Sequence, residues 1–159
     1  METSMRKILI ADDDLDDAAL LAEAIGTILP DAYIDFARDG IAALRHLKTA
    51  TQPDIVFLDL NMPLKNGLQC LRDIHNHELL QGKPVIIYST SNNLRDIDEA
   101  YNYDAAYYLI KPSSYRQLCK MVQYIVSTVL QAPANKTAKA DFVLTEAKLA
   151  ANPLGIPPL

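Results

Sequence analysis

The chain contains 159 residues, of which 50% are hydrophobic, and it carries a formal net charge of −5. A single ordinary domain fits this length, and a net negative charge with scattered Lys and Arg argues against a surface for nucleic acid or anionic membranes. The longest apolar runs fall short of the about 20 residues that span a bilayer, and the N-terminus lacks a secretory signal, so we expect a cytoplasmic protein.

Apolar runs of strand length alternate along the chain with segments of helical periodicity. A strand is expected at residues 7–11, followed by a helix over 18–28 that Pro30 ends, then a strand at 33–37 and a helix that Gly40 opens. The alternation continues with strands at 55–58, 85–88 and 107–110 and helices over 68–74, 95–103 and 114–129. Five strands alternating with five helices predict an α/β fold, a doubly wound parallel sheet with helices on both faces.

The composition changes near residue 131. Residues 131–137 resemble a linker, and the Pro-rich end from residue 152 is incompatible with regular secondary structure. Between them, Phe142-Val143-Leu144 is a short apolar patch that could dock on the domain. We therefore expect a domain over residues 6–130 and a tail over 131–159, docked if at all through 142–144.

Polar side chains follow four of the predicted strands, at the end where ligands bind in sheets of this type. Asp12 and Asp13 follow the first strand, Asp59 the third, Ser89 the fourth and Lys111 the fifth. Neighbouring carboxylates repel one another unless a proton or cation intervenes, and an all-oxygen acidic pocket suits Mg²⁺. A hydroxyl and an ammonium on the same rim add two donors for an anion, so the set suits phosphoryl transfer to a carboxylate.

These residues lie in five motifs that resemble the receiver domain of two-component response regulators. The motifs are Ile8 to Asp14 (ILIADDD), Asp54 to Pro63 (DIVFLDLNMP), Gly67, Ser89-Thr90 and Tyr108 to Pro112 (YLIKP). The resemblance covers roughly residues 6–130. Within the family, the chain is similar to stand-alone regulators that are associated with phytochromes. It implies a flavodoxin-like, five-stranded sheet in the order 2-1-3-4-5.

The resemblance also implies roles for the acidic residues. Asp59 corresponds to the phosphoacceptor of the family. Asp12, Asp13 and Asp59 correspond to the carboxylates that bind Mg²⁺, and Asn61 to the residue that lends a backbone carbonyl to the metal.

Three further residues are implicated by the same resemblance. Ser89 corresponds to the hydroxyl that turns toward the phosphoryl group, and Lys111 to the cation that binds it. Tyr108 corresponds to the aromatic residue whose rotamer reports phosphorylation. The bond between Lys111 and Pro112 is commonly cis in the family.

The implied function is that of a single-domain response regulator. It would accept a phosphoryl group from a sensor histidine kinase or a histidine phosphotransfer protein, and act as a switch rather than an enzyme, beyond self-phosphorylation and self-dephosphorylation. We expect output through a homodimer or a protein partner at the face of the fourth helix, fifth strand and fifth helix, without nucleic acid or membrane. The exposed candidates there are Ile97, Ala100, Tyr101, the edge of the fifth strand and residues 142–144.

The residues alone leave a calcium-binding loop open as another interpretation. Asp12, Asp14, Asp16 and Glu23 match ligand positions of such a loop. Asp17, however, stands where the loop needs a glycine for its sharp turn, and the preceding segment is strand-like where a helix is required.

Two more interpretations concern other chemistries. A haloacid-dehalogenase-like phosphatase has a nucleophilic Asp in a D-x-D arrangement after its first strand, as in Asp12 to Asp14, but a small hydroxyl residue usually follows where this chain has Leu15. A soft-metal site could involve Cys70, His75 and His77, although their spacing matches no strong zinc pattern.

Overall fold

The computed structural model describes residues 5–49, 52–80, 82–131 and 136–151. The Pro-rich end and most of the expected linker lie outside these residues. The elements in chain order are β1 (Lys7–Ala11), α1 (Leu15–Ile28), β2 (Tyr33–Ala37), α2 (Gly40–Leu47), β3 (Ile55–Leu58), α3 (Gly67–Asn76), the 3₁₀ turn η1 (Glu78–Leu80), β4 (Val85–Ser89), α4 (Leu94–Asn102), β5 (Tyr107–Ile110), α5 (Tyr115–Gln131), α6 (Lys139–Phe142), β6 (Val143–Leu144) and α7 (Glu146–Ala150).

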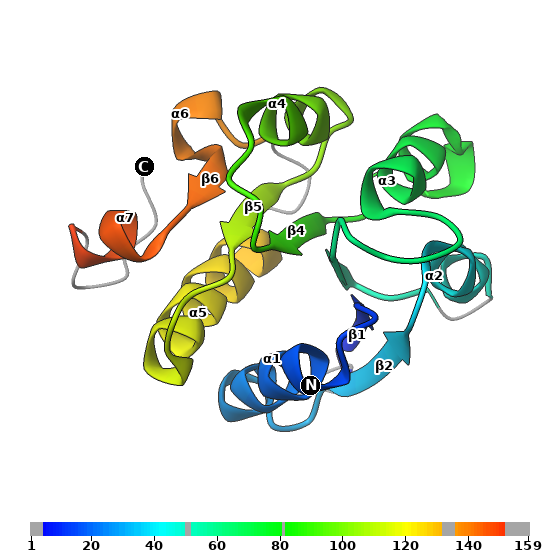
Figure 1. The fold of residues 1–159 in the computed structure, drawn as a ribbon. Coiled ribbons are helices and arrows are strands. Elements are labelled where there is room, and N and C mark those ends of the chain that lie inside the picture. Colours follow the sequence, from blue (N-terminus) through cyan, green and yellow to red (C-terminus); the bar gives the residue numbers. More distant parts are fainter. Residues whose placement is uncertain (1–4, 50–51, 81, 132–135, 152–159) are drawn as a thin grey trace.

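All the strands pair in parallel in one sheet, in the order β2-β1-β3-β4-β5-β6 (Figure 1). The predicted order of the first five strands is confirmed, and with it the doubly wound, flavodoxin-like arrangement. Burial on both faces of β3 and β4 explains why these strands are continuous apolar runs. A sixth strand of two residues, which the prediction did not include, pairs with β5.

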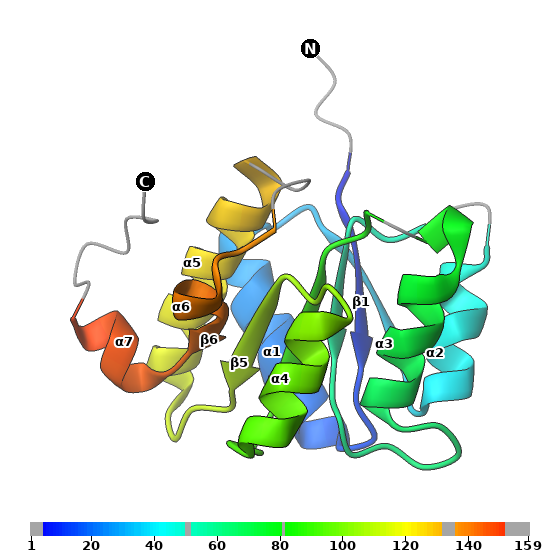
Figure 2. The same ribbon diagram turned by 90° about the horizontal axis from the view of Figure 1, so that it is seen from above.

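Helices cover both faces of the sheet (Figures 1 and 2). Helices α1 and α5 pack against the face that carries Ile8 and Ile10, whereas α2, α3 and α4 pack against the face that carries Leu9 and Ala11. Successive residues of a strand point to opposite faces, so each central strand contributes to both halves of the core. Among the described helices, none has the length and apolar character needed to cross a bilayer.

The side chains expected at an exposed output face are instead packed inside the molecule. β6 lies along β5 and covers its edge, and Phe142 is 0% exposed. Ile97 and Ala100 of α4 are also buried, at 8% and 0% exposure, while Tyr101 is partly buried. The expectation that Ile97 and Ala100 are exposed is therefore wrong, because both belong to the core on this face of the sheet. The ring of Tyr101 packs against Phe142 of the C-terminal segment.

A glycine holds the start of α3 against the end of β3. The N–H of Gly67 donates to the carbonyl of Leu60 at 2.9 Å, and Asn66 and Gln69 form a reciprocal capping box at this helix end. A Cβ added at Gly67 would lie 2.1 Å from the backbone carbonyl oxygen of Asp59. The absence of a side chain at Gly67 thus permits the close packing that fixes the backbone of Asp59.

Replacing Gly67 with Ala should lower the free energy of unfolding by about 2 kcal/mol or more, because the methyl group would collide with backbone atoms. Gly26 is the matched control, since it lies within α1 and a Cβ added there meets nothing within 4 Å. Gly26→Ala should stabilise the protein by up to about 1 kcal/mol through helix propensity. Urea denaturation measures both effects, and wild-type stability in Gly67→Ala would contradict the close contact.

Candidate functional site

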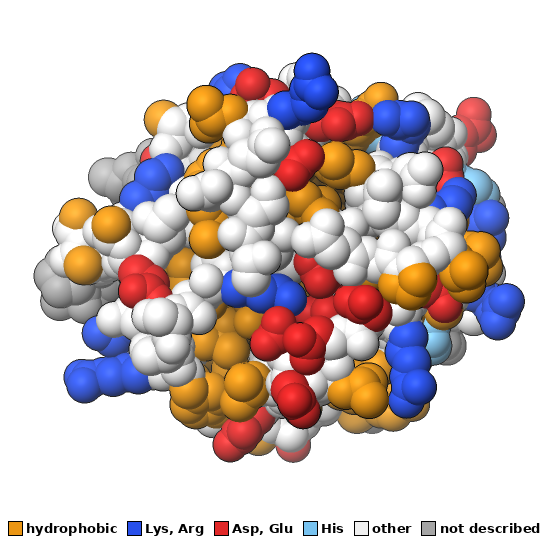
Figure 3. Space-filling view, viewed as in Figure 1, with side chains coloured by type: hydrophobic (Ala, Val, Ile, Leu, Met, Phe, Trp, Pro, Cys, Tyr) orange, Lys and Arg blue, Asp and Glu red, His pale blue; other side chains and the backbone are white. Residues whose placement is uncertain are grey.

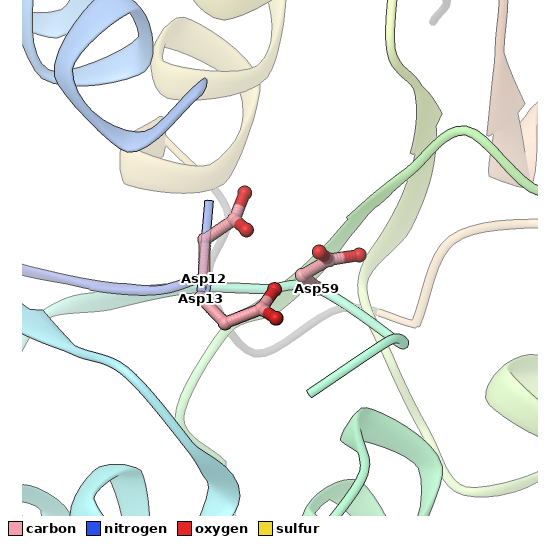
Figure 4. A group of neighbouring side chains, drawn as sticks. All are labelled: Asp12, Asp13 and Asp59. Carbon is pink, nitrogen blue, oxygen red and sulfur yellow. The ribbon is translucent and has the colours of Figure 1, made fainter. Parts of the chain in front are cut away.

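Three carboxylates meet at the carboxyl ends of two neighbouring strands. Asp12 and Asp13 follow β1, and Asp59 follows β3 (Figure 4). One carboxylate oxygen of each residue lies within 4.8 Å of one oxygen of each of the other two. These three oxygens are close enough together to bind one metal ion. Asp12 and Asp59 are 2% and 5% exposed, whereas Asp13 is open to solvent. Figure 3 shows acidic side chains gathered near the middle of this face, beside a basic one.

Lys111 supplies the positive charge of this pocket. Its Nζ lies 3.0 Å from Asp12 Oδ2, 2.9 Å from Asp17 Oδ2 and 3.5 Å from Asp59 Oδ2. The lysine side chain is only 9% exposed, and its ammonium lies 4.9 Å from the centre of the Tyr88 ring. One ammonium is therefore shared among three carboxylates and rests against an aromatic ring.

Burial and charge act in opposite directions on the two key ionisable groups. Burial raises the pKa of Asp59 to about 6, an effect that the nearby Lys111 ammonium reduces and the Asp12 carboxylate increases. Burial alone would lower the pKa of Lys111, but its hydrogen bonds to Asp17 and Asp12 outweigh burial and raise that pKa. The lysine thus remains charged. Because it is one ammonium among three carboxylates, the pocket favours binding of a further cation.

The remaining predicted residues lie around the same rim. Ser89, which is fully buried at the end of β4, accepts a hydrogen bond through its Oγ from the N–H of Ser91 at 3.2 Å. The hydroxyl of Tyr108, which is also fully buried, donates to the carbonyl of Ser91 at 2.9 Å. Asn61 approaches the site through its backbone, since its N–H donates to Asp59 Oδ1 at 3.4 Å. The structure therefore brings Ser89, Tyr108 and Asn61 to the surroundings of Asp59.

Two residues of the pocket were missed by the sequence analysis. Asp17 appeared only as a departure from the calcium-loop pattern, and Tyr88 only as part of a predicted strand. A weak signal existed for Asp17, because it lies in the first turn of the helix that begins at the pocket. No signal existed for Tyr88, because its contact with Lys111 depends on the register between β4 and β5.

The geometry does not support the calcium loop or the phosphatase arrangement. Helix α1 begins at Leu15, so Asp16 and Glu23 lie on a helix rather than in a loop. The Asp14 side chain caps that helix by accepting from the N–H groups of Asp16 and Asp17. Asp14 is therefore engaged as a helix cap and not as the second acid of a D-x-D site.

The geometry does not support the soft-metal interpretation, because Cys70, His75 and His77 form no group close enough to hold a metal ion in the described part of the chain. Burial raises the pKa of the Cys70 thiol to about 12, and its Sγ lies 3.8 Å from the Gly40 carbonyl. His75 lies 3.1 Å from a carboxylate oxygen of Asp104.

Every described peptide bond is trans, so the cis bond that the resemblance implied before Pro112 is not found.

The raised pKa of Asp59 predicts how stability depends on pH without metal. Because the native state holds this proton more tightly than the unfolded chain, the stabilisation is fully present below about pH 4 and is lost as the pH rises through about 6. In EDTA at pH 8, Asp59→Asn should therefore be more stable than wild type by on the order of 2 kcal/mol. The difference should shrink toward pH 4.

Lys111→Met provides the opposite control, because it leaves the buried carboxylates without their cation. It should lower stability at pH 8 by about 3 kcal/mol. Urea denaturation of both variants at several pH values measures the two effects. A less stable Asp59→Asn at pH 8 would contradict the charge balance described for the pocket.

The chain resembles known proteins over most of its length. Residues 8–123 match the response regulator receiver domain family. Response regulator Rcp1 of Synechocystis sp. is 33% identical over 130 residues, covering 78% of this chain and 88% of Rcp1. The probable methanogenesis regulatory protein FilR2 of Methanothrix harundinacea is 33% identical over 123 residues, covering 74% of this chain and 79% of FilR2.

Solved structures agree with these relatives. Phosphorylated RcpA, a cyanobacterial phytochrome response regulator, has a TM-score of 0.74 at 28% identity and covers 85% of this chain and 100% of RcpA. The Mn²⁺-bound form of Rcp1 has a TM-score of 0.73 at 32% identity and covers 84% of this chain and 99% of Rcp1. The expected similarity to phytochrome-associated regulators is confirmed. The chain belongs to the receiver domain family of two-component response regulators, a family of signalling switches.

Proposed function

We propose that this receiver accepts a phosphoryl group on Asp59 in a reaction that requires Mg²⁺. The observation that carries the proposal is the convergence of three carboxylates on one small volume with Lys111 beside them. Hard oxygen donors of this kind suit Mg²⁺, and Asp12, Asp13, Asp59 and the carbonyl of Asn61 would hold it. The Mn²⁺-bound form of the relative Rcp1 supports a divalent ion in this pocket.

The chemistry is a phosphoryl transfer to a carboxylate nucleophile. A carboxylate oxygen of Asp59 attacks the phosphorus of a phosphohistidine, a P–O bond forms, and the P–N bond breaks as its electron pair leaves with the imidazole, which takes up a proton. Lys111 is placed to bind a phosphoryl oxygen, and Ser89 to donate its hydroxyl to another. Bound Mg²⁺ would neutralise the charge of the carboxylates and of the incoming phosphoryl oxygens.

Phosphorylation would then change the loop that follows β4. The Ser89 hydroxyl accepts from the N–H of Ser91 here, and Tyr108 donates to the carbonyl of Ser91. Turning the hydroxyl of Ser89 toward a phosphoryl group gives up its present bond and shifts the residue that Tyr108 holds. New charge-assisted hydrogen bonds thereby favour a second arrangement of this loop and of Tyr108.

The phosphodonor that fits this role is a sensor histidine kinase or a histidine phosphotransfer protein in the cytoplasm. Membership of the receiver family supports this class of donor. No catalytic turnover is assigned to the chain beyond gain and loss of its own phosphoryl group.

Incubation with acetyl phosphate and Mg²⁺ should add one phosphoryl group per chain, because the pocket itself supplies the positioning and the charge. Asp59→Asn should abolish the addition, and Asp16→Asn should not, since Asp16 is an exposed residue of the first turn of α1. Intact-mass spectrometry measures the result. Full modification of Asp59→Asn would move the acceptor to another residue.

Mg²⁺ should raise the melting temperature of wild type, because an ion that binds only the folded pocket stabilises it by about 2.7 kcal/mol at 100 times its Kd. Asp13→Asn should weaken the response, since it removes one of the three carboxylates while leaving the buried pair intact. Thermal denaturation with Mg²⁺ or EDTA tests this. A wild type that does not respond to Mg²⁺ would contradict the proposed metal site.

A further inference from the structure

Residues 136–150 pack along the β5 edge of the sheet, and we call this segment the C-terminal clasp. Its strand β6 pairs with β5, Val143 opposite Tyr108 and Leu144 opposite Leu109. Helix α6 lies on the α4 side of the sheet and helix α7 on the α5 side (Figures 1 and 2). The clasp therefore straddles the sheet and covers the face made by α4, β5 and α5.

Apolar side chains of the clasp enter both halves of the core. Phe142 is 0% exposed and packs edge-on against Tyr101, with ring centres 5.1 Å apart, and against Tyr108 at 6.3 Å. Leu144 and Leu149 are buried on the other face. Phe142 is thus a buried aromatic anchor that contacts two aromatic rings of the domain.

Charges of the clasp and of α4 are complementary. Lys139 Nζ lies 3.0 Å from Asp98 Oδ1, and Lys136 Nζ lies 3.0 Å from Asp104 Oδ1. Lys136 Nζ also lies 4.2 Å from the centre of the Tyr101 ring. All four charged side chains are about half exposed, so these ion pairs add little to the affinity for the segment. They contribute instead to specificity, because they favour a basic segment.

The far end of the clasp reaches the loop that carries the phosphoryl-binding lysine. Glu146 Oε1 accepts from the N–H of Ser113 at 2.6 Å and from the Ser113 hydroxyl at 2.9 Å. Ser113 lies two residues after Lys111, whose backbone N–H donates to the carbonyl of Ser89. A movement of Lys111 toward a phosphoryl group would therefore strain the bonds between Ser113 and Glu146.

The clasp is also linked, through Tyr108 of β5, to the loop that follows β4. One side of the Tyr108 ring packs against Phe142, and its hydroxyl donates to the carbonyl of Ser91. Ser91 in turn donates to the Ser89 hydroxyl. The segment after Lys111 thus contacts the clasp directly, and the segment after Ser89 is linked to it through Tyr108.

We propose that the face formed by Asp98, Tyr101, Asp104, Tyr108 and Ser113 is a binding site for a basic–aromatic segment. The chain's own residues 136–150 occupy this site, and phosphorylation at Asp59 releases them. The inference rests on the proposed function at Asp59. The released face then accepts a protein partner that presents a strand with an aromatic anchor and preceding lysine or arginine residues. The clasp and the phosphoryl group are coupled ligands, so each weakens the binding of the other by the same factor.

Hydrogen exchange of the full chain tests release directly, with beryllofluoride and Mg²⁺ as the phosphoryl mimic. The amides of β6 and α7 should be protected in the free protein and should exchange at least about tenfold faster with the mimic. Unchanged or slower exchange in the same sample would overturn the proposal. Protected amides together with dimers in sedimentation would also overturn it, in favour of clasps exchanged between two copies.

Reciprocal coupling gives a second measurement on point variants. Phe142→Ala and Glu146→Gln should each bind beryllofluoride about threefold to tenfold more tightly than wild type, as measured by tyrosine fluorescence. Glu146 is on the surface, so this variant remains informative if Phe142→Ala does not fold. The control is Lys148→Gln, because Lys148 is exposed and bonds to the clasp's own Ala140 carbonyl. Wild-type affinity in Glu146→Gln, together with faster exchange of its clasp than in wild type, would overturn the coupling.

The two proposals fail in different ways. Intact-mass spectrometry after acetyl phosphate reports modification of Asp59 independently of the clasp. A chain that is never modified contradicts the proposed function itself. A chain that is fully modified but keeps its clasp protected contradicts only the release.

Discussion

One buried ammonium shared among three carboxylates sets the properties of this molecule. The Lys111 Nζ lies within 3.5 Å of oxygens of Asp12, Asp17 and Asp59, and Asp13 adds a further negative charge beside them. One positive charge cannot balance four negative ones at this density, so the pocket favours a bound cation or a proton. Burial is the largest cause of the raised pKa of Asp59, and the neighbouring Asp12 carboxylate raises it further.

The strand order of the sheet links this charged pocket to the surface of the molecule. Parallel strands bring Asp59, Ser89 and Lys111 to one edge because β3, β4 and β5 are neighbours that end together. Ser89 ends β4 and Lys111 follows β5, and the loops that continue from them reach the surface. Tyr108 and Ser113 connect them to the C-terminal segment, so a change of charge near Asp59 has a short physical route to the surface.

Much of the fold and site could be predicted because the signals are local or repeated. Buried parallel strands leave continuous apolar runs, and the chemistry-bearing residues Asp12, Asp59 and Lys111 come directly after them. The sixth strand could not be predicted, because two residues carry no periodicity and their pairing depends on the whole tail. The exposure of Ile97 was predicted wrongly because the face of α4 that packs against the sheet is decided by tertiary contacts.

We expect Lys111 to leave its carboxylate partners for the phosphoryl group once a metal ion occupies the pocket. A crystal structure of the protein with Mg²⁺ and beryllofluoride would show the new position of Lys111. We expect a fluoride of the mimic on Asp59 within hydrogen-bond distance of Lys111 Nζ, with Asp12 and Asp13 facing the metal. A lysine that still bridges Asp12 and Asp17, with the mimic bound elsewhere, would contradict the claim.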